Sequence, residues 1–414
     1  MKALIDQPNI ASEEDASAAG PAPSVARPHL VFMDFVTHFG GAQRSTVSLC
    51  RALMPSYEVR VVDPYVVCPD WLGALQEAKI PIHVLHSRSR RCFIGHEGRP
   101  LRRIGGLLAQ VPEQMKLRRR LRQVLGRIKP DLILTNSTKA LALLWVAGAF
   151  DRYRVVFYAR GWYQRHQVPA LGRWLIRKAH CVLAVSKATA GALQDWGVAR
   201  DRIHVVYTLI DPDQVTREGR AAIRDRPPHA DRACRILLPA QLHRAKGQGT
   251  AVEAARFLKD RGLDFVMWCA GDVKMGSDPR TVEGLVRDIA RRGLQDHVFL
   301  LGHRTDVPAL MRLADVVILP THSEGLPRAV WEAQVLERPV ISTPVGGVTD
   351  LIEDSHTGLL VPVDNGCALA VAIERLHRDE ALRQRIVHNA AGRIRSEFSR
   401  QRQQDALRRA LEQR

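Results

Sequence analysis

The sequence has 414 residues, of which 46% are hydrophobic, so two domains with separate cores are expected, and no apolar run is long enough to span a membrane. The seven cysteines are scattered and form no Cys-x-x-Cys pair, which argues against a disulfide scaffold or a zinc site and favours free thiols in a reducing compartment. The net charge of +18 favours an anionic partner, but no helix-turn-helix, RNA-binding or zinc-finger pattern is present, so we predict no binding to nucleic acid.

The first residues have the composition of a disordered tail. Residues 1–27 are rich in Ala, Ser, Glu and Pro and carry no hydrophobic periodicity. They also lack the basic start and the apolar centre of a signal peptide. We therefore expect a cytoplasmic protein.

Beyond this tail, apolar runs of strand length alternate with helical patterns, which is typical of parallel α/β layers. Helices are expected in most of the gaps, including residues 42–54 and 187–196, so residues 28–215 are predicted to form the first domain. The strands predicted in this domain are residues 29–35, 58–63, 81–85, 131–134, 154–158, 181–185 and 203–206.

Two loops of this domain have the residues of a binding site. Gly40 and Gly41 directly follow the first predicted strand and open a helix, where glycines permit close backbone approach and the helix N-terminus favours an anion. An ordinary tight turn is the alternative. Trp162 and Tyr163 follow another strand, and their rings suit packing on the C–H face of a sugar or on a neighbouring loop.

Much of the charge excess lies between residues 88 and 129, which contain thirteen Lys or Arg and two Glu. Apolar residues recur among these cations at helical spacing. A basic amphipathic helix fits an anionic membrane surface, where each cation contributes about 1 kcal/mol, whereas the alternative is a solvated helix that covers the sheet. We predict the membrane surface as a partner of residues 88–129. The cations expected to face it are Arg102, Arg103, Arg118, Arg119, Arg120 and Arg122.

A second domain follows a change in composition. Residues 216–233 are charged and contain a Pro-Pro pair, so they are predicted to be the interdomain linker. Residues 234–390 are predicted to form the second domain, and residues 391–414 a charged C-terminal helix. The strands predicted in the second domain are residues 234–239, 264–269, 298–301, 315–319, 339–342 and 358–361.

Two glutamates eight positions apart, Glu324 and Glu332, bracket the turn between the strand at residues 315–319 and a helix predicted at residues 328–336. Pro327 stands at the first helical position, where a missing N–H has no cost. The free amides of such a turn attract an anion, whereas a carboxylate beside them is better explained as an acceptor for hydroxyl groups. Phosphate together with hydroxyls indicates a sugar nucleotide. A helix start with two solvated acids is the alternative.

The segments around these acids resemble glycosyltransferase family 4, a group with the GT-B architecture and mostly retaining chemistry. Glu324 is followed by Gly-Leu-Pro, and Glu332 by Pro-Val-Ile and then a Gly-Gly turn, in the order and register of that family. The resemblance covers roughly residues 29–395. It implies two Rossmann-like parallel-sheet α/β domains that face a cleft, the first binding the acceptor and the second the nucleotide sugar. It also implies that the last helix crosses back to the first domain.

The resemblance assigns the diphosphate contacts. Lys246 matches a family lysine that neutralises the diphosphate of the donor, and it is expected to be catalytic. Gln241 stands where the family has a second cation, and Arg244 would supply that charge from the same loop. The amides of Gly325 and Leu326 would share in stabilising the leaving group.

The same resemblance assigns the sugar and base contacts. Glu324 is expected to be catalytic, holding the sugar hydroxyls and orienting the anomeric carbon, and Glu332 to accept from the ribose. Arg160 occupies the region where many relatives carry a cleft histidine. The residues expected to contact the base are Gly302, His303 and Arg304.

Together these features predict a retaining transferase that moves a sugar from a nucleoside-diphosphate sugar to a glycan or lipid-linked acceptor. The expected setting is synthesis of cell-surface polysaccharide, lipopolysaccharide or glycolipid at the inner face of the cytoplasmic membrane. No cofactor or metal is expected, because Lys246, helix dipoles and loop amides can hold the diphosphate. One alternative is a non-enzymatic membrane-surface protein that retains the fold, and Gln241 and Arg160 motivate it. The other is an epimerase or phosphorylase of similar fold, although no pyridoxal lysine site is found.

Overall fold

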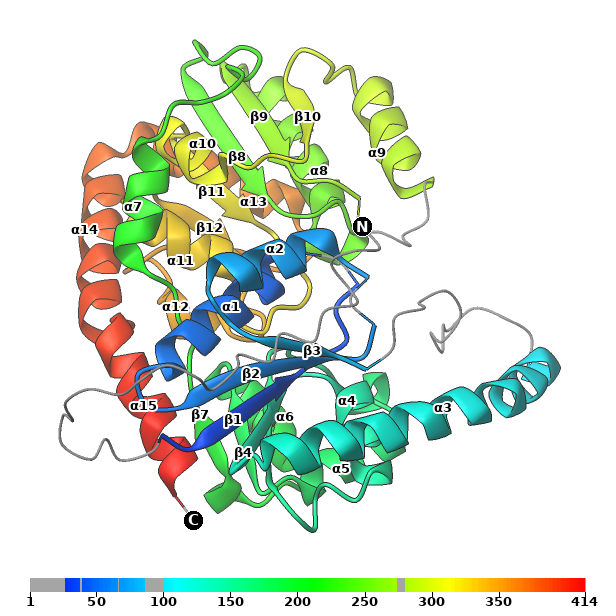
Figure 1. Ribbon diagram of the computed structural model, residues 1–414. Coiled ribbons are helices and arrows are strands. Elements are labelled where there is room, and N and C mark those ends of the chain that lie inside the picture. The colour runs from blue at the N-terminus through cyan, green and yellow to red at the C-terminus, as the bar shows by residue number, and fades with distance from the viewer. Residues whose placement is uncertain (1–26, 38, 66, 86–99, 274–279, 414) are drawn as a thin grey trace. The chain divides into compact units, whose positions relative to one another are not determined.

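The computed structural model describes residues 27–37, 39–65, 67–85, 100–273 and 280–413, with side chains at all of these except 42, 100–112, 280 and 281. Two parallel sheets carry helices on their faces (Figure 1). The predicted fold class, α/β with two Rossmann-like parallel-sheet domains, is confirmed. The tail predicted at residues 1–27 lies outside the described residues, apart from Arg27.

The first sheet has seven strands in the order β3-β2-β1-β4-β5-β6-β7. Its central strands are apolar on both faces and buried, as expected of parallel strands covered by helices. Each strand coincides with one of those predicted for this half of the chain. The strands are β1 (His29–Met33), β2 (Glu58–Asp63), β3 (Ile82–Val84), β4 (Leu132–Thr135), β5 (Arg154–Ala159), β6 (Cys181–Ala184) and β7 (Ile203–Val205).

The second sheet has six strands in the order β10-β9-β8-β11-β12-β13, and each again coincides with a predicted strand. Side-chain alternation divides its core into two clusters, one on each face. Ile236 and Leu238 of β8 belong to one cluster and Leu237, between them, to the other. The strands are β8 (Cys234–Pro239), β9 (Phe265–Ala270), β10 (Val298–Gly302), β11 (Val316–Leu319), β12 (Val340–Ser342) and β13 (Leu359–Leu360).

Side-chain caps start several of the helices. Ser137, Ser186 and Asn365 each accept a hydrogen bond from a backbone N–H of the first turn that follows them. The helices are α1 (Gly41–Leu53), α2 (Pro69–Glu77), α3 (Pro100–Ile128), α4 (Thr138–Val146), α5 (Ala170–Lys178), α6 (Lys187–Asp195), α7 (Pro212–Arg220), α8 (Gln248–Asp260), α9 (Arg280–Arg291), α10 (Val307–Leu313), α11 (Arg328–Val335), α12 (Val348–Leu351), α13 (Gly366–Arg378), α14 (Glu380–Glu397) and α15 (Arg400–Glu412).

Helix α7 occupies the start of the segment predicted as a linker, so residues 216–220 are helical. Asp211 caps this helix by accepting from two N–H groups of its first turn, and Pro212 stands at its first position. Val215 is buried in a core cluster of the second sheet. Gly219 lies so close to α11 that a Cβ there would be 2.6 Å from Leu336. The helix is obscured in the sequence because most of its residues are polar or charged.

Contacts divide the chain into two compact units. Among the described residues, unit 1 comprises those up to Phe157 together with Lys178–His180, and unit 2 comprises Tyr158–Arg177 and those from Cys181 onward. Unit 2 therefore contains the end of β5 and all of α6 together with the second sheet. It also contains α15, where the Ala410 carbonyl lies 3.7 Å from the Sγ of Cys181 in β6.

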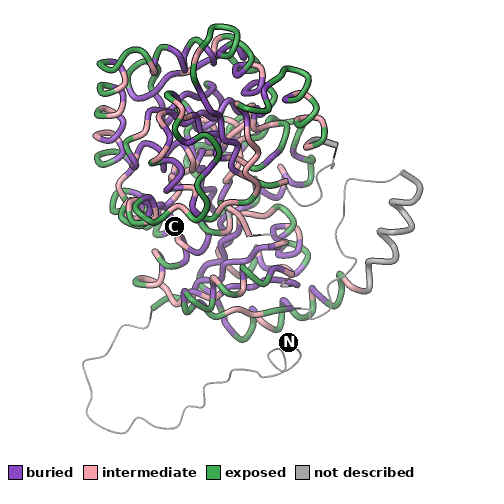
Figure 2. Tube along the Cα trace, turned by 90° about the horizontal axis from the view of Figure 1, so that it is seen from above, coloured by how far each residue is buried: buried purple, intermediate pink, exposed green. Residues whose placement is uncertain are grey.

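Burial follows this layered arrangement. Buried positions concentrate on the strands, and exposed positions on the outer faces of the helices (Figure 2). Among the described residues, no helix combines the length and the apolar character needed to cross a bilayer.

Candidate functional site

The loop that carries Glu324 joins β11 to α11 and is fixed to a neighbouring turn. The Thr321 hydroxyl donates to the Ala245 carbonyl at 2.9 Å, and the His322 N–H donates to the same oxygen at 2.9 Å. Ala245 is the centre of the 3-10 turn Arg244–Lys246, which follows β8. These bonds set the Glu324 loop beside Lys246, the residue predicted to bind the diphosphate.

Glu324 and Lys246, both predicted to be catalytic, form an ion pair. Nζ of Lys246 lies 2.6 Å from Oε1 of Glu324, and the two side chains are 28% and 11% exposed. Gly247 lets the turn that carries Lys246 lie against Pro320, at the start of the Glu324 loop. Its φ is +73°, and a Cβ there would lie 1.8 Å from the Pro320 carbonyl oxygen. Each side chain thereby neutralises the charge of the other in this partly buried position. A diphosphate and Glu324 would therefore compete for one ammonium group.

Three backbone segments of unit 2 meet around Gly325. A Cβ at Gly325 would lie 2.0 Å from the Arg160 carbonyl oxygen. A Cβ at Gly346 would lie 1.9 Å from the Glu324 carbonyl oxygen, and one at Gly347 would lie 2.0 Å from the Gly325 carbonyl oxygen. The Gly347 N–H also donates to the Glu324 carbonyl at 3.2 Å. Backbone thus occupies the space of a side chain at all three glycines, which holds the Glu324 loop in place.

The segment after β5 borders the same loop. The Ser323 hydroxyl donates to the Trp162 carbonyl at 3.0 Å, and a Cβ at Gly346 would lie 3.2 Å from the Trp162 Cβ. The Arg160 guanidinium lies 5.0 Å from the centre of the Tyr158 ring. Burial raises the pKa of Tyr158 to about 12, although the charge of Arg160 opposes this shift. The backbone of Arg160 and Trp162 thus lies beside the Glu324 loop, whereas the Arg160 guanidinium lies by the Tyr158 ring.

The amides before α11 are available to a ligand. Within the part of the chain that the structure describes, the N–H groups of Gly325 and Leu326 donate no hydrogen bond. They lie in the loop that leads into the helix, where unpaired amides and the helix dipole favour an anion.

Glu332 has a protein partner that the motif alone does not reveal. Its carboxylate is 11% exposed and accepts a hydrogen bond from Nε of Arg328, one turn earlier in α11. The i,i+4 spacing is the signal that could have identified Arg328 from the sequence. A ribose hydroxyl at Glu332 would share the carboxylate with this guanidinium.

Gln241 and Arg244 are both exposed. The Gln241 carbonyl accepts from Nε2 of Gln248 at 2.8 Å, which ties the loop after β8 to the start of α8. The Arg244 guanidinium makes no hydrogen bond or ion pair with a described residue. The guanidinium of Arg244 is therefore available to supply the positive charge that a glutamine at position 241 does not carry.

The residues predicted for the base pocket follow β10. The Gly302 carbonyl accepts from the Gly271 N–H at 2.9 Å, and His303 is exposed. Nε and Nη2 of Arg304 donate to the two carboxylate oxygens of Asp306 at 2.8 and 2.7 Å. Burial opposes ionisation of Asp306, but the bonds from Arg304 hold the pKa of that carboxyl below its usual range. The Arg304 side chain is thus engaged, which leaves backbone groups here for a ligand.

Gly40 and Gly41 belong to unit 1. Gly40 precedes α1, and its N–H donates to Oε1 of Gln43 at 3.1 Å. A Cβ at Gly41 would meet no described atom within 4 Å, so the described residues leave space at this helix start.

Tyr163 is 51% exposed and lines a pocket together with Trp162.

Among the described residues, no three His, Cys, Asp or Glu side chains come together as a metal site would require.

Two family models match the chain. The model described as Glycosyltransferase Family 4 matches residues 39–214, and the model described as Glycosyl transferases group 1 matches residues 219–393. The second match includes Lys246, Glu324 and Glu332.

Curated relatives are similar over part of their length. The alpha-D-kanosaminyltransferase of Streptomyces kanamyceticus is 32% identical over 236 residues, which are 56% of this chain and 57% of that protein. The putative colanic acid biosynthesis glycosyltransferase WcaL of Escherichia coli strain K12 is 31% identical over 239 residues, 55% of each chain. The amylovoran biosynthesis glycosyltransferase AmsK of Erwinia amylovora is 29% identical over 233 residues, 54% of each chain. The chain thus spans about half the length of the curated relatives that it matches.

Solved structures share the fold over nearly their whole length. Anabaena Alr3699/HepE in complex with UDP has a TM-score of 0.75 at 20% identity, covering 92% of this chain and 99% of that chain. A glycosyltransferase from Rickettsia africae ESF-5 has a TM-score of 0.74 at 19% identity, covering 94% of this chain and 100% of that chain.

Proposed function

Because the chain belongs to the group 1 glycosyltransferases of family 4, we propose that it transfers a glycosyl unit from a nucleoside-diphosphate sugar to a glycan or lipid-linked acceptor. The observation that carries this proposal is the Lys246–Glu324 pair at 2.6 Å, beside the unpaired amides that precede α11. A cation and N–H donors suit a diphosphate leaving group, and a carboxylate suits the hydroxyls of a sugar.

In the proposed mechanism, donor binding exchanges the partners of this ion pair. The diphosphate oxygens take over the ammonium of Lys246, which releases Glu324 to accept hydrogen bonds from the sugar and to orient its anomeric carbon. Negative charge grows on the leaving phosphate as the glycosidic bond breaks, so Lys246 contributes more in the transition state than in the ground state.

We extend the proposal to retention of the anomeric configuration, by attack on the same face and without a protein nucleophile. It rests on the family resemblance. The anomeric proton coupling of the transferred sugar, measured by NMR, decides between retention and inversion.

The donor and the acceptor are proposed from the neighbours of the chain. Anabaena Alr3699/HepE was solved with UDP and glucose, which makes a UDP-sugar the first donor to test. Relatives named for amylovoran and colanic acid biosynthesis favour a growing cell-surface polysaccharide as the acceptor.

The test has two stages. Protection against thermal unfolding by UDP-, GDP- and ADP-sugars identifies the donor. Incubation of the protein with that donor in radiolabelled form and a membrane extract should then move label into saccharide. Release of a sugar 1-phosphate from an oligosaccharide and inorganic phosphate would indicate a phosphorylase, and an epimerised nucleotide sugar would indicate an epimerase. An unchanged donor would favour the non-enzymatic alternative.

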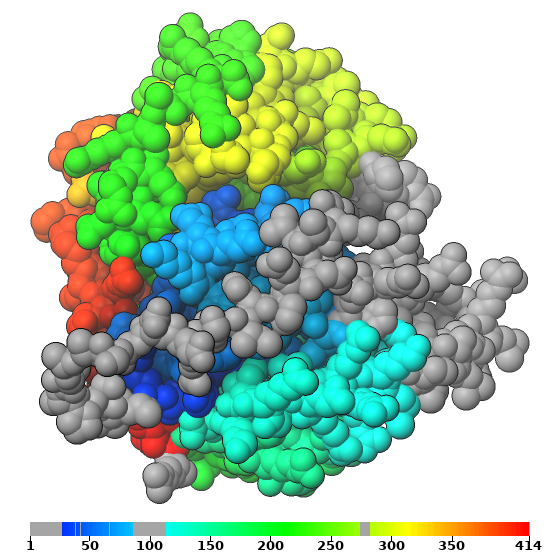
Figure 3. Space-filling view, in the orientation of Figure 1, coloured from blue at the N-terminus to red at the C-terminus, as the bar shows by residue number. Residues whose placement is uncertain are grey.

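We also propose that exposed cations of α3 hold the protein at an anionic membrane, at the inner face of the cytoplasmic membrane. The described part of α3 lies at the surface (Figure 3), and Lys116, Arg119 and Arg127 are exposed there without a described partner. Residues 88–99 and the side chains of residues 100–112, including Arg102 and Arg103, lie outside the described residues.

The apolar stripe in the described part of α3 packs on the protein, so the polar face of this part is the one that could meet a membrane. Leu117, Leu121 and Leu125 are at most 2% exposed, so this stripe packs inside the protein and cannot enter a bilayer. Nη1 of Arg120 donates to the Leu85 carbonyl at 2.6 Å, and Arg122 is bonded to another backbone carbonyl. Those two arginines fix the helix, which leaves electrostatic attraction by the exposed cations as the means of binding.

A further inference from the structure

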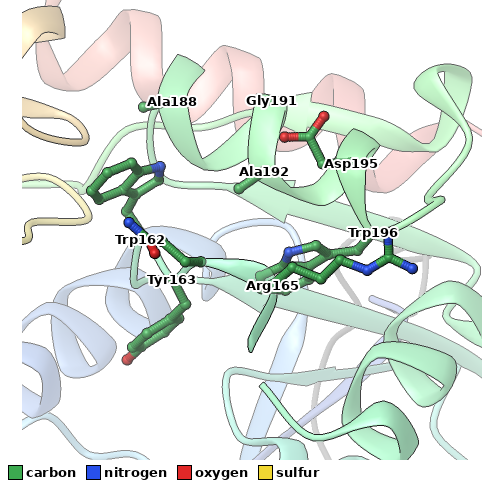
Figure 4. A pocket seen from close by; sticks show the side chains of 9 residues that line it. Trp162, Tyr163, Arg165, Ala188, Gly191, Ala192, Asp195 and Trp196 are labelled. Atoms are coloured by element: carbon green, nitrogen blue, oxygen red, sulfur yellow. The ribbon is translucent and has the colours of Figure 1, made fainter. Parts of the chain in front are cut away.

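A pocket of about 360 Å³ lies in unit 2 between the loop after β5 and one face of α6 (Figure 4). Its volume falls within the range of about 300–1,000 Å³ that small-molecule sites have. The loop side carries Trp162, Tyr163 and Arg165. The helix side carries Gly191 and Asp195, four positions apart and therefore on one face of α6.

Both sides of the pocket are fixed to the Glu324 loop or its neighbours. On the loop side, the Trp162 carbonyl accepts from the Ser323 hydroxyl at 3.0 Å, one residue before Glu324. On the helix side, the first N–H of α6, from Lys187, donates to the buried Asp350 of α12 at 2.7 Å. Each wall of the pocket is therefore held by a hydrogen bond to a segment next to the Glu324 loop, which places the pocket near the proposed donor site.

The chemistry of the pocket matches a carbohydrate. Trp162 and Tyr163 both line the pocket, and each carries an aromatic ring with a polar group, which suits packing on the C–H face of a pyranose. Trp196, 7% exposed, adds part of a second indole at the end of α6. Asp195 and Arg165 are exposed. The Asp195 carboxylate can accept hydrogen bonds from sugar hydroxyl groups, and the Arg165 guanidinium can donate hydrogen bonds to them. One negative and one positive side chain leave no net charge, which favours a neutral sugar.

We propose that this pocket binds a neutral pyranose unit of the acceptor, adjoining the unit that attacks the donor. The proposal rests on the proposed function and deepens it, because it gives unit 2 an acceptor subsite in addition to the donor site. Asp195 offsets the charge of Arg165, so the pocket offers a phosphate group no net positive charge.

Gly191 offers a direct way to close the pocket. A Cβ at Gly191 would meet no described atom within 4 Å, so a larger side chain can project from the helix without moving the described backbone. Leu is also a better helix former than Gly, so Gly191→Leu should fold. Gly73 of α2 is a matched control, because it is likewise an exposed helical glycine whose Cβ would meet nothing within 4 Å. Asp195→Asn is a second, isosteric variant that does not depend on filling the space.

The binding test uses the full chain and methyl glycosides of glucose, galactose, mannose and N-acetylglucosamine, followed by saturation-transfer NMR. At least one glycoside should bind the wild type and Gly73→Leu, and Gly191→Leu should lose this binding. Asp195→Asn should weaken it by about three- to tenfold, because a charged hydrogen-bond acceptor becomes neutral. The proposal is overturned if no glycoside binds the wild type, or if Gly191→Leu binds as well as the wild type. Binding of farnesyl phosphate alone, lost in Gly191→Leu, would overturn it in favour of a lipid pocket.

The transfer assay with a membrane extract ties the pocket to the acceptor. The glycoside that binds should slow transfer of label while leaving the slow hydrolysis of the donor by water unchanged. Inhibition of both reactions, or of neither, overturns the acceptor assignment. Protection against thermal unfolding by UDP-, GDP- and ADP-sugars is measured on the same samples. If none of these donors protects the wild type, the proposed function fails, whereas the glycoside result still decides the pocket.

Discussion

Nζ of Lys246 lies 2.6 Å from Oε1 of Glu324, although 78 positions separate the two residues in the chain. Lys246 follows β8 and Glu324 follows β11, and these strands are neighbours in the second sheet. The carboxyl ends of neighbouring parallel strands lie at one edge of the sheet, which is where open α/β sheets bind ligands. A substitution of either residue should therefore change how the other meets the donor.

Glu324→Gln should lower turnover by about 10- to 150-fold, which corresponds to the roughly 1.5–3 kcal/mol of a charged hydrogen bond. The same change removes the intramolecular competitor for Lys246, so binding of UDP should be maintained or tightened. Steady-state rates and calorimetric titration with UDP measure the two effects. Glu353→Gln is the control, because Glu353 is exposed and its carboxylate has no described partner. Turnover near that of the wild type in Glu324→Gln would contradict the assignment of Glu324 to the donor sugar.

Lys246→Ala should weaken binding of UDP by at least tenfold and leave binding of uridine nearly unchanged, because the variant loses a cation that meets only the phosphates. Calorimetric titration with both ligands gives the comparison. Arg244→Ala, measured in parallel, shows whether this exposed arginine supplies the cation missing at Gln241. Equal losses of UDP and uridine binding in Lys246→Ala would show that Lys246 does not contact the diphosphate.

EDTA should leave the rate of transfer largely intact. Lys246 and the amides of Gly325 and Leu326 can compensate the charge on the leaving diphosphate without a metal ion. The measurement is the initial rate in the presence of the chelator, with and without later addition of Mg²⁺ or Mn²⁺. Complete loss of activity that a metal ion restores would contradict the proposed leaving-group chemistry.

Asp306→Asn should destabilise the fold by about 1.5–3 kcal/mol at neutral pH, because it removes the charged partner of the Arg304 guanidinium. The pKa of Asp306 is lowered in the folded state, so its contribution to the free energy of unfolding is present above the unfolded pKa of about 3.9 and is lost as the pH falls through the folded pKa. Urea unfolding of wild type and variant should therefore differ by a constant amount from pH 5 to 8 and converge below pH 4. Asp225→Asn is the control, because the Asp225 side chain is 90% exposed although it lies 4.0 Å from Arg304. A difference that persists unchanged at pH 3 would show that the Asp306 charge is not its source.

The strands are predictable because each is a short apolar run between turn residues, and burial on both faces makes this pattern strong. Helix α7 is obscured because its two packing positions, Val215 and Gly219, are outnumbered by polar and charged residues. In α3 the apolar stripe is visible in the sequence, but the sequence cannot tell whether Leu121 packs against protein or lipid. The structure assigns it to the protein core.

Residues of the candidate site can be predicted from the sequence where they stand together in one local motif. Contacts between residues that lie far apart in the chain cannot be predicted in this way. Glu324, Glu332 and Lys246 stand in local motifs. The Lys246–Glu324 bond and the contact of Gly325 with the Arg160 carbonyl arise only from folding, because they join segments far apart in sequence. For the same reason Asp195 has no motif of its own, and it becomes a candidate only because α6 places it opposite the loop after β5.

The exposed cations of α3 should control attachment to anionic membranes. Replacement of Lys116, Arg119 and Arg127 by Gln should reduce co-sedimentation with anionic liposomes by at least tenfold, given about 1 kcal/mol for each cation near the surface. Sedimentation of the wild type should rise with the content of anionic lipid and fall with added salt, because the attraction is screened over about 8–10 Å at physiological ionic strength. Arg120 and Arg122 stay in place, since they bond to backbone carbonyls and their loss would also loosen the helix.

The control for this experiment removes the same charge from other exposed helix positions. Replacement of Arg385, Arg395 and Arg409, on α14 and α15, by Gln should leave co-sedimentation close to that of the wild type if position matters more than net charge. Both triple variants should retain protection by UDP, because neither set lies in the loops proposed to hold the donor. If the wild type ignores anionic liposomes at low salt, α3 is solvated cover over the first sheet, and a soluble acceptor becomes the better expectation. If both triple variants lose binding equally, a diffuse attraction by the net charge of +18 explains the attachment, and α3 has no special part in it.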